Sequence, residues 1–487
     1  MLRASIAAET AGVPSVSIVC PGFEGQATAT ARGHGFDGLP LAVTEGHVDA
    51  VDAERLIADF VTHTVDAVVA GLTAAVARVE ATAAAADEPA AADEPAAADE
   101  SDREPAALDV VTAGTIDQVH RFFLDRGWSD GLPFIPPTRD RVEAFIEVTG
   151  HDPWRRLGVA TSSGRDLTVW SVAVNAVMAG CRPEYLPVLL AATDILADPG
   201  YGMEHSGNTT GADALLIANG PMVDQLGFNH GPGALREGAE ANTTIGRWLR
   251  LYLRNVCGFT VAEHDKATFG NSTRVVLAED EAALAELGWD PLAADFGVAR
   301  GRDAVTMARL NSGAIIGSVV GSTPDEILPY LGDGLARIAG WDLTHNYGLG
   351  NGQFRPLLVL SPILARIFGR AGWTKDEVRH GLFRHARIPA ERYQRLIGAW
   401  SNLTPGRRRL TDLVAEGAVP AAFAESDDPG RLVPIVVDPS RFVIAVAGDP
   451  NRTNAYAFAN DGPHGDWTAR EVDRARSDDL VCRVPSD

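Results

Sequence analysis

The stretch GVPSVSIVCPGFEGQATATARGHGFDGLPLAV, residues 12–43, carries the clearest fold signal in this 487-residue chain. It opens with VPSVSIVC (13–20), a β-branched run typical of a buried strand, and closes with LPLAV (39–43), which predicts a second strand. Between them, a Pro-Gly turn leads into a helical segment at 23–32 that ends at Gly33. The order strand, helix, strand is that of a parallel α/β unit.

Two helical patterns flank this unit. One lies at 4–11, and the other predicts a long helix with a break at 52–79. Two strands are too few for an independently stable parallel sheet, which usually needs three or more. Residues 1–80 are therefore expected to form an incomplete, Rossmann-like half of a doubly wound α/β domain.

Residues 81–107, ATAAAADEPAAADEPAAADESDREPAA, differ from the rest of the chain in composition. Thirteen of these 27 residues are Ala, the unit DEPAAA occurs twice, and there is no large apolar residue to bury. Because each Pro interrupts a helix and the carboxylates repel one another, an acidic, semi-extended linker is expected. Its eight acids and one Arg contribute −7 to the formal net charge of −23. An acidic interaction segment is the alternative.

The overall composition disfavours several kinds of partner. The chain has 42 Lys and Arg against 65 Asp and Glu, and this acidity argues against nucleic acid or an anionic membrane as the main partner. No uninterrupted apolar run approaches about 18 residues, and the first residues show no signal pattern. Four scattered cysteines are too few for a disulfide framework. We therefore expect a cytoplasmic protein.

After the linker, residues 108–487 alternate helical and strand patterns without a further break in composition. This region is expected to be one large, mixed α+β domain that carries the functional site, so the chain as a whole is of the α/β class. Strands are expected at 215–218, 273–278, 304–309, 357–360 and 442–447. Helices are expected at 115–127, 166–179, 184–197, 243–256 (capped by Asn242) and 375–384 (capped by Thr374 with Glu377).

Two cysteines are candidates for thiol chemistry. Cys20 ends the first predicted strand, before a helix whose N-terminus would lower the pKa of the thiol. Cys181 stands between two predicted apolar helices. Free cysteine is also a common buried residue, so a packing role is the alternative for both.

A polar, glycine-rich loop, GYGMEHSGNTTG at 200–211, separates an apolar helix from an apolar strand. Burial in a core does not explain such a loop, whereas close approach to a ligand does. Glu204 and His205 would act as acid and base or as a metal pair. The loop residues expected to contact substrate are Asn208, Thr209 and Thr210.

A second polar region follows the same strand, with NGP at 219–221 and GFNHGPG at 227–233. Asn219 would contact substrate, and His230 would act as a further acid or base. Because the two polar regions flank one strand, we expect them to form one site with the 200–211 loop. Two ordinary irregular loops are the alternative.

The run ANTTIGR at 241–247 is expected to open a helix, whose N-terminus attracts anions. Arg247, Arg250 and Arg254 share one face of that helix and would suit a carboxylate or phosphate. A salt-bridged or solvated face is the alternative. The residues expected to contact the anion are Asn242, Thr243, Thr244 and Arg247.

The N-terminal residues that carry the α/β pattern resemble the closing half of the UGSC-like domain. This family is named for a motif of selenocysteine (or Cys), Gly, Ser and Cys, and the resemblance implies a Rossmann-type sheet with thiol redox chemistry. The motif itself is absent from this chain, which starts after the place where it would stand. The segments with the resemblance are GVPSV (12–16), CPGF (20–23), LPLAV (39–43) and His47.

The larger region resembles a companion domain of UGSC-type proteins, for which the resemblance implies no established activity. The segments that carry this resemblance are WSDGLP (128–133), GCRPEYLPV (180–188), NGP (219–221) and ANTTIGR (241–247).

These observations together predict an enzyme or enzyme subunit that acts on a small polar or anionic organic molecule. The resemblance implies thiol-dependent reduction or C–X bond cleavage, with a UGSC partner chain supplying the redox motif, or else a homo-oligomer. One alternative is a metal-dependent hydrolase or lyase using Glu204, His205 and His230, although no usual metal-ligand spacing is present. Another alternative is a non-catalytic interaction subunit. The sequence identifies no cofactor.

Overall fold

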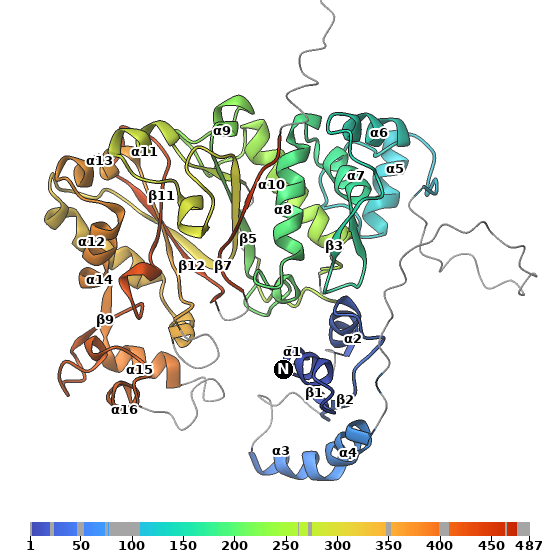
Figure 1. Cartoon of the computed structure of the whole chain (residues 1–487), viewed down its shortest axis with the longest axis horizontal. Coiled ribbons are helices and arrows are strands. Elements are labelled where there is room, and N and C mark those ends of the chain that lie inside the picture. The colour runs from blue at the N-terminus through green and yellow to red at the C-terminus, as the bar shows by residue number, and fades with distance from the viewer. Residues whose placement is uncertain are drawn as a thin grey trace, which may run out of the picture.

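The protein is represented by a computed structural model, shown in Figure 1. The residues that it describes are 2–19, 24–45, 53–73, 76, 108–261, 263–270, 275–346, 352–398, 409–462 and 465–474. The expected linker at 81–107, Cys20 and His47 lie outside these residues.

The N-terminal module has the predicted strand–helix–strand order. Strand β1 (Ser17–Val19) pairs in parallel with β2 (Leu41–Val43), and α2 (Glu24–Gly33) connects them. The long helix expected at 52–79 is interrupted by a π-helical turn, which explains the predicted break. The module's other helical segments are α1 (Leu2–Thr10), α3 (Ala53–Asp59), η1 (Phe60–Thr64) and α4 (Val65–Thr73).

The end of α2 packs against the large domain. A Cβ on Gly33 would lie 2.7 Å from Cα of Thr161, and a Cβ on Gly164 would lie 3.6 Å from Cβ of Arg32. Both large-domain residues belong to the turn between β3 (Arg156–Val159) and β4 (Asp166–Thr168). The module forms a separate lobe beneath this hairpin (Figure 1).

The large domain is built on one mixed, seven-stranded sheet with the order β11-β8-β12-β7-β5-β6, in which β13 also pairs with β7. Strand β5 is parallel to β6 and β11 is parallel to β8, whereas the other pairings are antiparallel. This confirms the α/β class. The strands are β5 (Asp213–Asn219), β6 (Leu277–Ala278), β7 (Ala304–Ile316), β8 (Leu357–Leu360), β11 (Val443–Val446), β12 (Ala455–Asn460) and β13 (Thr468–Glu471).

The sheet curls until its two edges meet. The backbone N–H of Asp280, just after β6, donates to the carbonyl of Val446 in β11 at 2.8 Å, and the Glu279 carboxylate accepts the N–H of Val446. Alternate residues of six strands therefore fill an inner core. Its strand residues are Leu215, Ile217, Leu277, Ala308, Leu310, Leu357, Val359, Val443, Ala445 and Phe458.

The strand order has an approximate two-fold symmetry, which we did not anticipate from the sequence. The triplet β6-β5-β7 and the triplet β11-β8-β12 each contain a parallel pair followed by an antiparallel strand. The middle strands of the two triplets, β5 and β8, also resemble each other in sequence. They read LLIAN at 215–219 and LLVLS at 357–361. The seam between the two halves is the antiparallel pair β7–β12.

Two groups of helices cover the outside of the sheet, one over each triplet (Figure 1). Over the first lie α5 (Ile116–Asp125), α6 (Arg139–Glu147), α7 (Val169–Ala179), α8 (Leu186–Ala197), α9 (Met222–Gln225) and α10 (Glu240–Asn255). Over the second lie α11 (Glu281–Leu287), α12 (Pro324–Ile338), α13 (Pro362–Arg370), α14 (Lys375–His385), α15 (Ala390–Gly398) and α16 (Leu410–Ala415). A small antiparallel pair, β9 (Arg387–Pro389) and β10 (Leu432–Pro434), joins the second group.

Capping explains where several helices begin. Thr374 and Glu377 form the predicted capping box of α14. Helix α7 begins at Val169, later than expected, because 166–168 form β4 and Thr168 caps the helix with Ser171. The prediction that Asn242 caps α10 is wrong, since that helix already starts at Glu240.

Candidate functional site

The two polar regions expected to form one site lie at opposite ends of β5. The 200–211 loop precedes the strand, and His230 follows it and a short helix. A seven-residue strand spans roughly 20 Å. The prediction that the two regions form one site is therefore wrong, and so is the prediction of a metal site made of Glu204, His205 and His230. Among the described residues, no three His, Cys, Asp or Glu side chains are grouped to hold a metal ion.

The 200–211 loop is anchored where the N-terminal module meets the large domain. Glu204, buried in η3 (Met203–His205), accepts a hydrogen bond from the Thr161 hydroxyl at 3.1 Å. His205 is partly exposed, with Nε2 3.8 Å from Oε1 of Glu204. Since Thr161 also contacts Gly33 of α2, these residues connect the loop to the N-terminal module.

A buried ion pair lies directly behind this loop. Arg309 of β7 directs Nε toward Oδ2 of Asp461 at 3.4 Å, and the two side chains are 1% and 0% exposed. Nη1 of Arg309 donates to the carbonyls of Tyr201 and Gly202, both at 2.6 Å. These contacts hold the start of the loop against the sheet. Asp461 follows β12, so the pair spans the seam between the two halves.

A second buried carboxyl belongs to the same region. Asp342, in the 3-10 helix η5 (Trp341–Asn346), accepts a hydrogen bond from Nδ2 of Asn311 at 2.6 Å. Burial raises the pKa of Asp342 to about 7, and the nearby charge of Asp461 adds to the rise. The hydrogen bond from Asn311 opposes this effect without cancelling it. Asp342 therefore keeps its proton to a much higher pH than an ordinary aspartate.

Two amides and a hydroxyl join the carboxyls to the surface. Nδ2 of Asn208 donates to Asp461 at 2.8 Å, just as Asn311 donates to Asp342. The exposed Thr210 hydroxyl lies 2.8 Å from Oδ1 of Asn208 and 3.1 Å from Oδ1 of Asn311. A continuous hydrogen-bonded path therefore connects both carboxyls with solvent. We call Asn208, Thr210, Arg309, Asn311, Asp342 and Asp461 the carboxyl–amide cluster.

The cluster holds two buried carboxyls in different surroundings. Asp461 is paired with Arg309, whereas burial raises the pKa of Asp342 to about 7. Acid–base sites use titratable groups whose surroundings differ in this way. The cluster is therefore our candidate functional site.

Four residues of this cluster were missed by sequence reasoning: Arg309, Asn311, Asp342 and Asp461. A signal existed at two places. Arg309 and Asn311 interrupt an apolar strand pattern, and the run AND at 459–461 ends another. Asp342 gave no such signal, because only the fold brings η5 beside β7.

The opposite end of β5 holds a different polar group. Asn219 donates to Glu279 at 2.6 Å and to Glu281 at 3.2 Å, and burial raises the pKa of Glu279. Glu279 also accepts backbone N–H groups, so it ties together the strand ends where the sheet closes. His230 Nδ1 lies 3.7 Å from Asp280, whose carboxylate raises the pKa of His230. These residues have structural partners within the fold.

The expected anion site on α10 is not formed as predicted. Arg247 makes a bidentate pair with Asp130, at 2.9 and 3.0 Å, and also donates to the carbonyl of Pro133. Arg250 pairs with Asp213 at 3.0 Å. Arg254 donates to the carbonyl of Gly127 at 3.5 Å, so the first two arginines of this face are salt-bridged and the third bonds the backbone.

The polar residues at the start of α10 also have structural partners. Asn242 is buried and bonds the backbone of Asn229 and Val276. Thr243 accepts the N–H of Gly238, and Thr244 donates to the carbonyl of Glu240. In the described structure these side chains therefore fasten the helix to neighbouring loops.

We expect Arg247→Ala to lower the free energy of unfolding by about 2 kcal/mol, because it leaves Asp130 partly buried without its bidentate partner. The carboxyl–amide cluster should be unaffected, since the two places share no contact. Urea unfolding measures the first effect. Unchanged stability of the variant would contradict the structural role of Arg247. Loss of ligand binding with full stability would restore the anion-binding role.

The described cysteines are poor nucleophiles. Burial raises the pKa of Cys181 to about 12, and burial also raises the pKa of Cys257. A thiol with a raised pKa stays protonated, and the thiolate is the reactive form. The packing alternative for Cys181 is favoured. The prediction for Cys20 falls outside the described residues.

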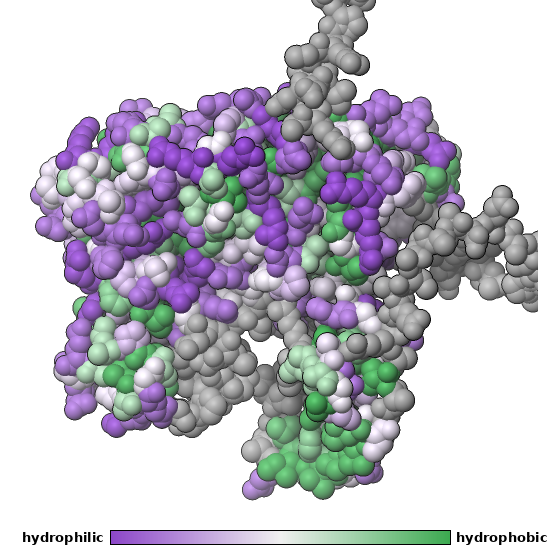
Figure 2. Space-filling model, viewed as in Figure 1, coloured by the Kyte–Doolittle hydropathy of each residue, from purple (hydrophilic) through white to green (hydrophobic). Residues whose placement is uncertain are grey.

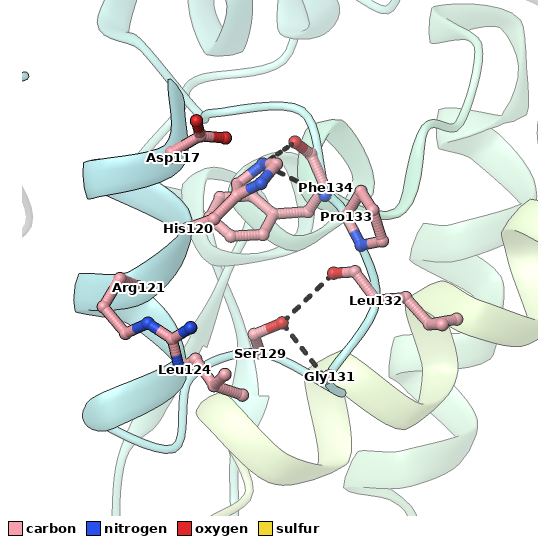
Figure 3. A pocket seen from close by; sticks show the side chains of 9 residues that line it. All are labelled: Asp117, His120, Arg121, Leu124, Ser129, Gly131, Leu132, Pro133 and Phe134. Carbon is pink, nitrogen blue, oxygen red and sulfur yellow. Dashed lines mark hydrogen bonds between the residues drawn. The ribbon is translucent and has the colours of Figure 1, made fainter. Parts of the chain in front are cut away.

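A pocket of about 310 Å³ lies between α5 and the 129–134 turn (Figure 3). Nε2 of His120 lies 2.9 Å from the carbonyl of Phe134, and its ring lies against the Phe134 ring at 4.6 Å. Ser129 bonds within the turn itself. His120 and Ser129 therefore help to fix this turn, whose Pro133 carbonyl also accepts a hydrogen bond from Arg247. The lining residues are Asp117, His120, Arg121, Leu124, Ser129, Gly131, Leu132, Pro133 and Phe134.

Comparison with known proteins identifies the N-terminal module. Residues 1–74 match the UGSC family, which confirms the resemblance of this module to that family. No curated protein and no solved structure matches the chain.

Proposed function

We propose that this chain, whose N-terminal module is a UGSC-like domain, is an enzyme or enzyme subunit that acts on a small polar organic molecule through Asp342 and Asp461. The observation that supports this is the pair of buried carboxyls, one beside Arg309 and one with its pKa raised to about 7. Buried groups with a perturbed pKa, as Asp342 has, are enriched at functional sites.

In this proposal Asp342 is the proton donor and Asp461 the proton acceptor. A donor works best when its pKa is near the working pH, which holds for Asp342. Asn208 and Asn311 orient the two carboxyls, and Thr210 holds both amides in place through their oxygens.

In this proposal the substrate is a neutral or cationic polar molecule, whereas the sequence predicted a polar or anionic one. The arginine of the cluster is already shared between Asp461 and two carbonyls. The cluster thus offers two carboxyls and no uncommitted arginine. Its exposed member is Thr210, whose hydroxyl suits hydroxyl, amide or amine groups, and the neighbouring Thr209 is also exposed.

A thiol-dependent step would need a thiol other than those of Cys181 and Cys257. Cys181 and Cys257 are held protonated by burial, so Cys20 or a partner chain remains the proposed source of redox equivalents. Glu204 and His205 lie beside the contact with the N-terminal module, where such a thiol could act with them. A cytoplasmic location fits this chemistry and is part of the proposal.

A pooled-substrate experiment tests the acid–base proposal. The protein is incubated with mixtures of neutral, cationic and anionic polar compounds, and consumption is followed by mass spectrometry. Asp342→Asn should slow consumption of the active compound about 100-fold or more, because proton transfer is lost while the shape is kept. Asp333→Asn, at an exposed position of α12, is the matched control. Unchanged consumption in Asp342→Asn and Asp461→Asn would contradict the proposal.

A further inference from the structure

An apolar face of the N-terminal module lies exposed at the lower end of the molecule. Ile57, Val61, Val69 and Leu72 are 64%, 65%, 57% and 43% exposed. Figure 2 shows hydrophobic residues gathered over α3 and α4 at this end. Isolated exposed aliphatic residues are ordinary, but a contiguous patch usually marks an interaction site.

These side chains form one stripe along the helical segment. The spacing of four residues from Ile57 to Val61, and of eight more to Val69, keeps them on one face across the π-turn. Only 6% of the most apolar window within Glu54–Thr73 is buried, although its mean hydropathy is 1.4. The aliphatic side of this helix therefore faces solvent instead of packing against a hydrophobic core.

The adjoining sheet is also incomplete in the described structure. Among the described residues, no third strand pairs with β1 or β2. A two-stranded sheet is marginal alone, and its outer edges present backbone N–H and C=O groups that favour pairing with another polypeptide.

We infer that the stripe of Ile57, Val61, Val69 and Leu72 is the docking face for a second copy of this chain. This inference is independent of the proposed reaction. At these exposed fractions the four side chains offer on the order of 400 Å² of apolar surface, so a pair would bury about 800 Å² before the rim is counted. That area fits a weak dimer, and a two-fold axis allows one aliphatic stripe to pack against its own copy.

A membrane is the less suitable occupant. By length and composition Glu54–Thr73 passes as a possible membrane span, contrary to the expectation that no segment would. The segment also carries Asp59 and Asp66, whose carboxylates would have to leave water. Asp59 pairs with Arg55 at 3.6 Å, and this ion pair would also have to leave water in a membrane.

Sedimentation velocity on the full chain at micromolar concentrations tests this inference. The wild type should dimerise, and Val61→Glu or Val69→Glu should raise the dimer dissociation constant at least ten-fold, because each buries a charge in the interface. Val320→Glu, at a valine of the large domain that is 66% exposed, should leave dimerisation unchanged. Circular dichroism checks folding, and the shape-conserving Val61→Thr should weaken the dimer by a smaller factor if Val61→Glu unfolds the module.

The opposing outcomes are equally definite. A wild-type monomer at every concentration, or a dimer that tolerates both glutamate variants, would overturn the inference. So would flotation of the wild type with phosphatidylcholine vesicles that Val69→Glu abolishes, because the face would then bind lipid. Failure of the dimer would leave the substrate-consumption result unaffected, and the reverse also holds, so the two proposals can fail separately.

Discussion

Replacing Arg309 by Met should lower the free energy of unfolding by about 3–5 kcal/mol, the usual cost of breaking a buried ion pair. Arg309 and Asp461 are almost completely shielded from water. Met fills much of the same volume but leaves the Asp461 carboxylate without its cation. It also leaves the carbonyls of Tyr201 and Gly202 without their donor. Urea unfolding monitored by tryptophan fluorescence measures the loss.

The matched control is Arg337→Met, which removes an exposed arginine that pairs with Asp333 one helical turn away. Exposed pairs of this kind contribute little, so its stability should be close to that of the wild type. Equal stability of the two variants at neutral pH would show that the buried pair does not hold the loop.

Asp342→Asn should stabilise the protein at pH 8 by up to about 4 kcal/mol and change it little at pH 4. Burial raises the pKa of Asp342 from 3.8 to about 7 in the folded chain. Between these two values the unfolded chain has released the proton that the folded chain keeps. Folding stability therefore falls as pH rises from about 4 to about 7, and a neutral amide removes that fall.

The measurement is a series of urea unfolding curves from pH 4 to pH 8, with Asp333→Asn as the exposed control. In the wild type and the control, the free energy of unfolding should fall between about pH 4 and about pH 7 because of Asp342. In Asp342→Asn this contribution to the fall should be absent. A variant whose stability follows the wild-type profile at every pH would mean that Asp342 is ionised in the folded chain, which removes the proposed proton donor.

Local patterns predicted the elements well where a strand or helix depends on its own residues. The strand at 357–360 and the capping box at Thr374 agree with the structure. The parallel pairing of β1 and β2 followed from the βαβ order and a short connection. Strand β7 was predicted at 304–309 but continues to Ile316, and its polar residue Asn311 belongs to the carboxyl–amide cluster.

The candidate site was harder to predict because its parts meet only in the folded sheet. The 200–211 loop was correctly chosen as unusual, but its partners Asn311 and Asp461 lie 101 and 253 residues further along the chain. Conversely, Arg247 looked available for an anion because its partner, Asp130, precedes it by 117 residues. Sequence spacing shows which residues share a helix face, and it does not show which charges the fold has already paired.

Infrared spectroscopy tests the central claim most directly, because the stretching band of a protonated carboxyl is distinct from that of a carboxylate. Wild-type protein minus Asp342→Asn, recorded across pH, should show one protonated carboxyl that disappears with a midpoint near pH 7. The Asp461→Asn variant should keep the band, with the midpoint moved downward, because the Asp461 charge contributes to the raised pKa. A difference spectrum with no protonated carboxyl above pH 5 would contradict the account.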